Sequence, residues 1–252
     1  MGLSIGYEFR DGSRRAAARR LVRALRARAL TLRFDRISEI QELDPADAAS
    51  GDLEPGGGWL QLCATRYVKH VCAGEELWLD VPPLHAIVFS VHCEGAETGS
   101  FGLAMYPTTI AHECAGTPTA LPTELGATYS WSTCCKTQYA GLPQHGGIDN
   151  FVRAHRALVD LLDAAIDLGL GVKVYDDAGF WKDRDEQKLI HKLNDWNRLI
   201  AAFVGTLKDS LGADADGRIA APIRSHPAFE HLEADALLKR RNRRTKKPPA
   251  NG

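Results

Sequence analysis

The sequence lacks a hydrophobic run long enough to cross a membrane. Its longest apolar stretches, 86–89 and 199–204, fall far below the roughly 18 residues that a membrane-spanning helix needs. The first residues lead directly to Glu8 and Arg10 without the apolar segment of a secretory signal, and Gly6 breaks the myristoylation pattern. These absences predict a cytoplasmic protein with no membrane span.

Cys-x-x-Cys motifs and an excess of charge of one sign are also missing. Six cysteines are few for 252 residues, and none forms a Cys-x-x-Cys pair, which predicts reduced thiols and not a disulfide scaffold. Lys+Arg 31 and Asp+Glu 32 nearly cancel, which excludes the strongly basic composition of a dedicated nucleic-acid-binding protein. With 44% hydrophobic and 25% charged residues, the composition is that of an ordinary globular protein.

Catalytic and nucleotide-binding signatures are absent as well. The sequence contains no Walker loop, no dinucleotide fingerprint and no His-Glu-x-x-His, so no cofactor is predicted. Residues 2–6 match Gly-x-Ser-x-Gly, but a nucleophile elbow needs a strand before the serine and a helix directly after it. That match is therefore rejected.

The charge that is present is segregated along the chain. Residues 1–36 hold ten arginines against three acids, and residues 239–247 hold seven basic residues and no acid, so the middle carries an acidic excess. Solvated faces of opposite sign are one interpretation, and contacts with a protein partner are another. Residues 239–252 are predicted to be a disordered basic tail. Its nonspecific binding to nucleic acid is a weaker alternative to a solubilising role, because it has no aromatic residue for base stacking.

Hydrophobic periodicity predicts one α+β domain over residues 1–238. The predicted fold is a mostly antiparallel sheet with amphipathic helices packed on one face, opening β-α-β. The predicted strands are 4–9, 32–40, 59–67, 76–80, 86–92, 102–106, 127–139 and 172–175, with a polar loop over 108–126. The predicted helices are 14–30, one that Asp149 caps and Gly169 ends, a long one that a capping box at 183–186 begins, and 228–238.

The strand predicted over 127–139 separates two faces by alternation. Its apolar face, expected to be buried, is Tyr129, Trp131, Thr133, Cys135, Thr137 and Tyr139. Its polar face is Ser130, Ser132, Cys134, Lys136 and Gln138. These polar side chains could line a pocket, or they could simply face solvent, as one side of an antiparallel sheet commonly does.

The segment after this strand has features of an anion-binding site. His145, Gly146 and Gly147 come directly before a predicted helix, whose N-terminus carries partial positive charge. If the loop folds back over the strand end, Lys136, Gln138, His145, Gly146 and Gly147 would form a small site for phosphate or carboxylate. Alternatively, the glycines serve only the turn.

Other polar residues have mainly structural interpretations. His155 lies on an apolar helical stripe and is expected to be a packed core histidine. His70 and Cys72, His112 and Cys114, and His92 and Cys93 make a tetrahedral zinc site conceivable. Their spacings match no familiar ligand pattern, so no metal is predicted and the cysteines are expected to act as small buried hydrophobes.

Two functions follow as hypotheses. The first is a cytoplasmic binding or regulatory module without catalytic activity. The alternative is an enzyme for a small anionic substrate, with Cys134 as nucleophile, Lys136 stabilising its thiolate or the substrate, and His145 as acid or base.

Three segments are similar to a group of bacterial proteins to which no activity has been assigned. They are residues 135–140, residues 179–181 with Arg184 and Asp185, and residues 196–209. The resemblance spans much of residues 125–232. It implies a bacterial origin, but no fold, activity or catalytic residue.

Overall fold

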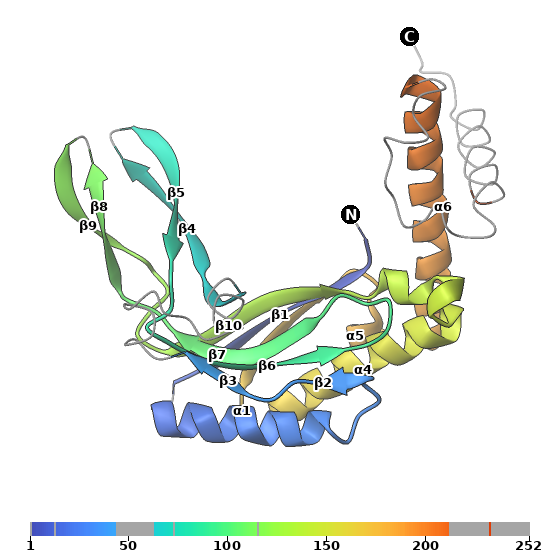
Figure 1. Cartoon of the computed structure of the whole chain (residues 1–252), viewed down its shortest axis with the longest axis horizontal. Helices are drawn as coiled ribbons and strands as arrows, with labels where there is room; N and C mark the ends of the chain where they lie inside the picture. The colour runs from blue at the N-terminus through green and yellow to red at the C-terminus, as the bar shows by residue number, and fades with distance from the viewer. Residues whose placement is uncertain are drawn as a thin grey trace, which may run out of the picture.

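The fold is organised around one antiparallel sheet. The computed structural model describes residues 2–12, 14–43, 63–72, 74–114, 116–211 and 232 (Figure 1). The seven strands of this sheet are β1 (Ser4–Asp11), β2 (Arg36–Ile37), β3 (Gln41–Leu43), β6 (His85–His92), β7 (Gly99–Met105), β10 (Tyr129–Lys136) and β11 (Gly171–Asp176). Their order is β11-β1-β10-β7-β6-β2, and β3 also pairs with β6. The predicted α+β class with a mostly antiparallel sheet is confirmed.

The register of the central strands puts the large side chains on one face. Ile5, Tyr7 and Phe9 of β1 are almost fully buried, and the residues between them are partly exposed. Phe9 lies opposite Trp131 of β10, and the hydroxyl of Tyr7 and the indole N–H of Trp131 both donate to the carbonyl oxygen of Ser100. This face forms the core, because the large apolar residues recur at every second position of the strands and so point to the same side.

Two amphipathic helices cover the large-residue face. Helix α1 (Arg15–Ala29) buries Ala18, Val22, Leu25 and Ala29, which recur every three or four residues. Helix α4 (Gly147–Asp167) buries a similar stripe that includes Phe151, Leu158 and Leu162. Both lie beneath the sheet in Figure 1. No helix in the described part of the chain is long and apolar enough to span a membrane.

Two structures rise from the opposite side of the sheet, at its two ends (Figure 1). One is the arm, which consists of two hairpins: β4 (Arg66–Cys72) with β5 (Glu75–Val81), and β8 (Thr109–Cys114) with β9 (Thr117–Pro122). The other is α6 (Glu186–Leu211), which follows the short α5 (Phe180–Asp183). The 3-10 turns η1 (Gln138–Gly141) and η2 (Pro143–His145) connect β10 to α4.

Several predicted elements have different bounds or a different form. The predicted strand 32–40 is replaced by the short strands β2 and β3, and β2 pairs with β6. The predicted loop 108–126 contains the β8–β9 hairpin. β4 begins at Arg66, whereas its predicted strand began at 59; residues 59–62 lie outside the described residues.

The ends of two elements also need correction. β10 ends at Lys136, so Gln138 is not on its polar face but buried in η1. Helix α4 is capped by Gly146 in the left-handed conformation, and Asp149 lies in its first turn. The predicted helix 228–238, apart from Leu232, and the basic tail 239–252 lie outside the described residues. The single domain over 1–238 stays a prediction.

Candidate functional site

Two of the predicted anion-site residues, Lys136 and His145, contact glutamates in the turn between β6 and β7. The Nζ of Lys136 lies 3.2 Å from Oε1 of Glu97, and Oε2 of Glu97 accepts the backbone N–H of Lys136 at 3.0 Å. The hydrogen bond and charge of Glu97 raise the pKa of Lys136 above its ordinary value. Nδ1 of His145 lies 2.9 Å from Oε1 of Glu94 in the same turn. An anion that bound here would therefore compete with two carboxylates.

The remaining anion-site residues also have partners within the protein. The N–H groups of Gly146 and Gly147 donate to the carbonyl oxygens of Pro143 and Leu142, both at 3.1 Å. The amide of Gln138 is buried; its Oε1 accepts the N–H of Leu3 and its Nε2 donates to Asn197. The structure thus brings Lys136 and His145 to one turn and places Gln138 in a separate buried contact.

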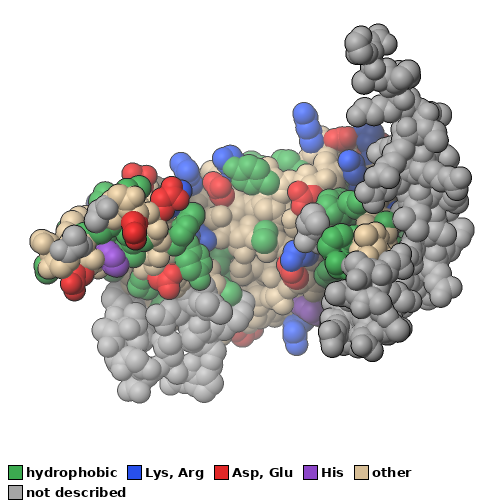
Figure 2. Space-filling model, turned by 90° about the horizontal axis from the view of Figure 1, so that it is seen from above, with side chains coloured by type: hydrophobic (Ala, Val, Ile, Leu, Met, Phe, Trp, Pro, Cys, Tyr) green, Lys and Arg blue, Asp and Glu red, His purple; other side chains and the backbone are tan. Residues whose placement is uncertain are grey.

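Cys134, the nucleophile of the enzyme hypothesis, is the exposed member of the four free cysteines in the described chain. It lies on the open face of the sheet, where its register partner in β1 is Gly6. Burial raises the pKa of Cys93 to about 11, and burial also raises the pKa of Cys135, so these two thiols are structural. The open face between the arm and α6 is mostly tan in Figure 2, which reflects small and polar side chains and backbone.

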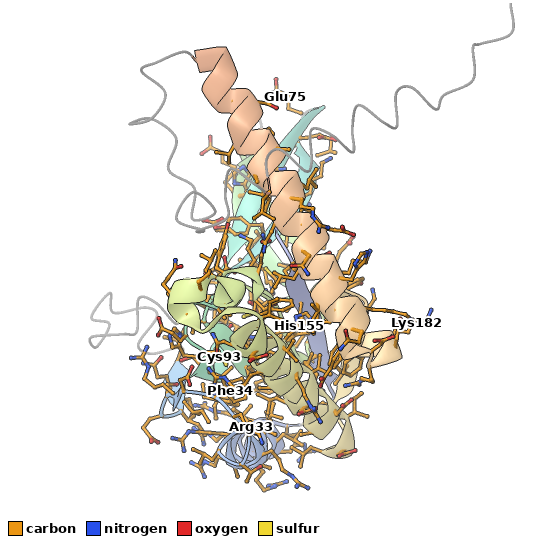
Figure 3. All side chains as sticks on the ribbon, turned by 90° about the vertical axis from the view of Figure 1, so that its right-hand side faces the viewer. Arg33, Phe34, Glu75, Cys93, His155 and Lys182 are labelled. Carbon is orange, nitrogen blue, oxygen red and sulfur yellow. A yellow bond between two sulfur atoms is a disulfide. The ribbon has the colours of Figure 1, made fainter. Side chains whose placement is uncertain are left out.

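A buried polar cluster joins α4 to the ends of β10 and β11. His155, labelled in Figure 3, is fully buried, and its Nδ1 lies 2.9 Å from Oγ1 of Thr137. Its Nε2 lies 3.3 Å from Oδ1 of Asp176, whose side chain is 2% exposed. The rings of Phe151 and Phe180 flank the imidazole. The order Thr-His-Asp resembles a nucleophile, base and orienting acid, but all three groups are closed off from solvent. The prediction that His155 is a core histidine is confirmed.

A polar groove of about 440 Å³ lies between residues 31–33, which follow α1, helix α4 and the start of α6. Arg156 pairs across it with Glu186 at 2.9 Å, and Arg153 pairs with Asp35 at 2.7 Å. The adjoining part of the groove holds the pair of Arg184 and Asp163 at 2.8 Å. Because these arginines are already paired with acids, the groove is best explained as the seam along which the helices contact each other.

The arm is fastened at its tips by a disulfide between Cys72 and Cys114, whose Cα atoms are 5.8 Å apart. Cys72 is the last residue of β4 and Cys114 is the last residue of β8. The prediction that all six cysteines are reduced is therefore wrong for these two, because the fold brings together residues 42 positions apart. In this disulfide-bonded state, the described residues contain no group of three or more His, Cys, Asp or Glu placed to hold a metal ion.

The hairpins of the arm have distinct inner and outer faces. In β4, the inner residues Val68, His70 and Cys72 are partly buried, and in β8 Ile110, His112 and Cys114 are. Val68 and Ile110 pack against the main core. The arm is thus an extension of the core and not a free loop.

The outer face of the first hairpin exposes three large hydrophobic side chains. Tyr67, Val71 and Trp78 are 63%, 67% and 65% exposed. Trp78 lies opposite Lys69, so it is diagonal to both Tyr67 and Val71, within reach of a long side chain. We call these three residues the arm patch. Figure 2 shows hydrophobic side chains on the arm, interspersed with acidic ones.

Comparison with known proteins adds no identification: no family model, no curated protein and no solved structure matches the chain.

The sequence analysis missed the arm patch because its two strands were not recognised as one exposed hairpin. The alternation in residues 66–72 was the available signal, since Tyr67, Lys69 and Val71 share one face and Val68, His70 and Cys72 share the other.

Proposed function

We propose that the protein is a non-catalytic binding module of the cytoplasm, and that the arm patch contacts a protein partner. The observation that carries this proposal is the cluster of Tyr67, Val71 and Trp78 on the outer face of a projecting hairpin. Trp and Tyr are enriched among the residues that dominate binding energy at protein interfaces. The resemblance of much of residues 125–232 to bacterial proteins supports a bacterial origin and nothing more specific.

The arm supplies a rigid platform for such a contact. Its inner face packs against the core through Val68 and Ile110, and the Cys72–Cys114 clasp restrains both hairpins. A strand whose backbone is already restrained loses little backbone freedom on binding, which favours affinity. The arm patch is therefore preorganised for binding.

The rim of the patch indicates the chemistry of the partner. Lys69 is paired with Glu76 at 2.6 Å, which leaves Asp80, opposite Tyr67, as an acidic neighbour of the patch. A complementary surface would present an apolar depression for Trp78 with basic residues at its edge. The acidic excess in the middle of the chain favours the same kind of partner.

Truncating the centre of the patch tests this proposal. Trp78→Ala should weaken binding to the purified partner by about 2 kcal/mol or more, roughly 30-fold, because a central interface tryptophan is lost. Tyr175→Ala is the matched control, since Tyr175 is a similarly exposed aromatic residue on β11, at the edge of the main sheet. Titration calorimetry with the partner isolated by affinity capture measures both. Equal affinity of the two variants and the wild type would refute a role for the patch.

The exposed thiol of Cys134 supports a second proposal, an enzyme that acts on a small anionic substrate with Lys136 and His145. This activity requires Lys136 and His145 to leave Glu97 and Glu94. An activated nucleophile should react with iodoacetamide much faster than glutathione does at pH 7. A Cys134 rate no greater than that of glutathione, together with an unchanged cellular phenotype for Cys134→Ala, would eliminate the enzyme proposal.

A further inference from the structure

The tips of the arm bring together four side chains with metal-binding chemistry. Two His-x-Cys pairs, His70 with Cys72 and His112 with Cys114, end the strands β4 and β8. In an extended strand, residues i and i+2 point to the same side and lie about 6.5 Å apart. Each histidine therefore lies on the same face as its cysteine, one step closer to the base of the arm.

The Cys72–Cys114 disulfide determines how the two His-x-Cys pairs are placed relative to each other. β4 and β8 both run from the sheet toward the tips and end at the linked cysteines, whose Cα atoms are 5.8 Å apart. Because the two strands end together, we expect the histidines two residues earlier to lie at matching heights on the inner faces of the two hairpins. All four residues are partly buried, as expected for inner-face positions.

One of these histidines has an unused nitrogen. Nε2 of His70 is buried and makes no hydrogen bond with the described residues. A buried polar nitrogen without a partner carries a free-energy cost that a metal ion would remove. Glu75 and Glu113, exposed at the tips, add negative charge that favours a cation; Figure 3 labels Glu75 on the arm.

We propose that the reduced arm binds one Zn²⁺ through Cys72, Cys114, His70 and His112. Two thiolates and two neutral imidazoles form one of the usual tetrahedral sets for structural zinc, and they neutralise its charge. The site is closed in the oxidised state because the two sulfur atoms are bonded to each other. Zinc and the disulfide are thus alternative clasps for the same two hairpins, and the proposal does not depend on the arm patch.

The exchange between the two clasps balances chemically. A dithiol reductant gives two electrons and two protons to the Cys72–Cys114 bond; the S–S bond breaks, two thiols form, and the reductant becomes a disulfide. Zn²⁺ then displaces the two thiol protons as two Zn–S bonds form. A reducing cytoplasm, where disulfides are uncommon, would favour the zinc-bound state.

Metal titration of the full-length protein tests the site. After reduction with a phosphine, which does not hold zinc as a dithiol does, Co²⁺ should bind with one ion per chain. It should show thiolate charge-transfer absorption and the intense visible bands of tetrahedral coordination, and Zn²⁺ should displace it. Cys72→Ser and Cys114→Ser should lose this spectrum. His70→Ala and His112→Ala should each weaken Zn²⁺ affinity about tenfold or more.

Matched variants separate this site from other donors and from misfolding. Cys134→Ser and His191→Ala, which change an exposed cysteine and an exposed histidine on other elements, should bind as the wild type does. His70→Cys, which restores a metal donor, should bind even if His70→Ala does not fold. The proposal fails if the reduced wild type does not bind Co²⁺, if the oxidised protein binds it equally well, or if both histidine variants keep wild-type affinity.

Discussion

At the residue scale, the pair of His155 and Asp176 is an enclosed polar contact, because their side chains are 0% and 2% exposed. Burial alone would raise the pKa of Asp176, but the close contact with the His155 imidazole and the N–H groups of Trp181 and Ala178 outweigh it. The pKa of this carboxyl is therefore held below its ordinary value of 3.8. The carboxylate ties the start of α5 to β11 and α4.

Asp176→Asn should lower the free energy of unfolding by about 3 kcal/mol. The substitution removes the charge beside His155 and turns an amide N–H toward a backbone N–H that now donates to the carboxylate. Urea unfolding at pH 7 measures the loss. Asp177→Asn is the neighbouring control; Asp177 is more exposed and accepts bonds from Ser4, so it should cost less than about 1 kcal/mol. Equal costs would contradict the account of this cluster.

The same carboxyl predicts a pH dependence. Because the folded pKa of Asp176 is depressed, its contribution is fully present above the ordinary pKa and is lost as the pH falls through the folded value. The free energy of unfolding should therefore fall more steeply in the wild type than in Asp176→Asn between about pH 5 and pH 2. Parallel curves for the two proteins would show that Asp176 does not titrate in this way.

Sequence reasoning reached some of these residues and not others. It predicted His155 as a core residue because periodicity alone locates a buried helical stripe. It placed Gln138 on the polar face of a strand because nothing in the alternation of 127–139 marks the end of the strand at Lys136. Asp176 and Asp177 are adjacent acids in the sequence, and only the fold shows that one is buried and the other is not.

At the element scale, the residue that caps the start of α6 differs from the residue that the sequence predicts. The sequence predicts a capping box that begins at Asp183, whereas in the structure Oδ1 of Asp185 accepts the N–H groups of Gln187 and Lys188 at 3.0 and 3.1 Å. Asp183 instead pairs with Lys188 on the surface at 2.8 Å. Asp185 therefore satisfies the free donors of the first turn.

Asp185→Ala should destabilise the protein by about 1 kcal/mol, the usual cost of losing a helix cap. Asp183→Ala should cost no more than about 0.5 kcal/mol because it removes only an exposed ion pair. Thermal or urea unfolding of the two variants compares them directly. A larger loss for Asp183→Ala would favour the capping residue that the sequence predicts.

The arm shows why some elements escaped sequence analysis. The β8–β9 hairpin contains Pro118 and Pro122, which are poor strand residues except at edges, and it has few apolar positions beyond Ile110 and Leu121. A two-stranded hairpin has only edge strands, so these prolines are tolerated. The disulfide could not be predicted for a different reason. Pairing between cysteines 42 residues apart depends on the path of the chain in the fold.

At the scale of the whole molecule, the two faces of the sheet differ in what packs on them. One face and its two helices form the core, and the other carries the arm and α6 (Figure 1). Periodicity in the sequence predicts the core face, because burial imposes it. The direction in which the arm projects depends on contacts between residues far apart in the chain, and those leave no local pattern.

The arm patch should meet its partner in the cell, and photo-crosslinking tests this most directly. A benzophenone amino acid in place of Trp78 should crosslink to a discrete protein in the organism that encodes the chain, and mass spectrometry identifies the adduct. The same probe at Tyr175, on the edge of the main sheet, is the control. We predict a specific adduct from position 78 that is absent from position 175. No adduct at 78, or the same adducts from both positions, would contradict a binding role for the arm.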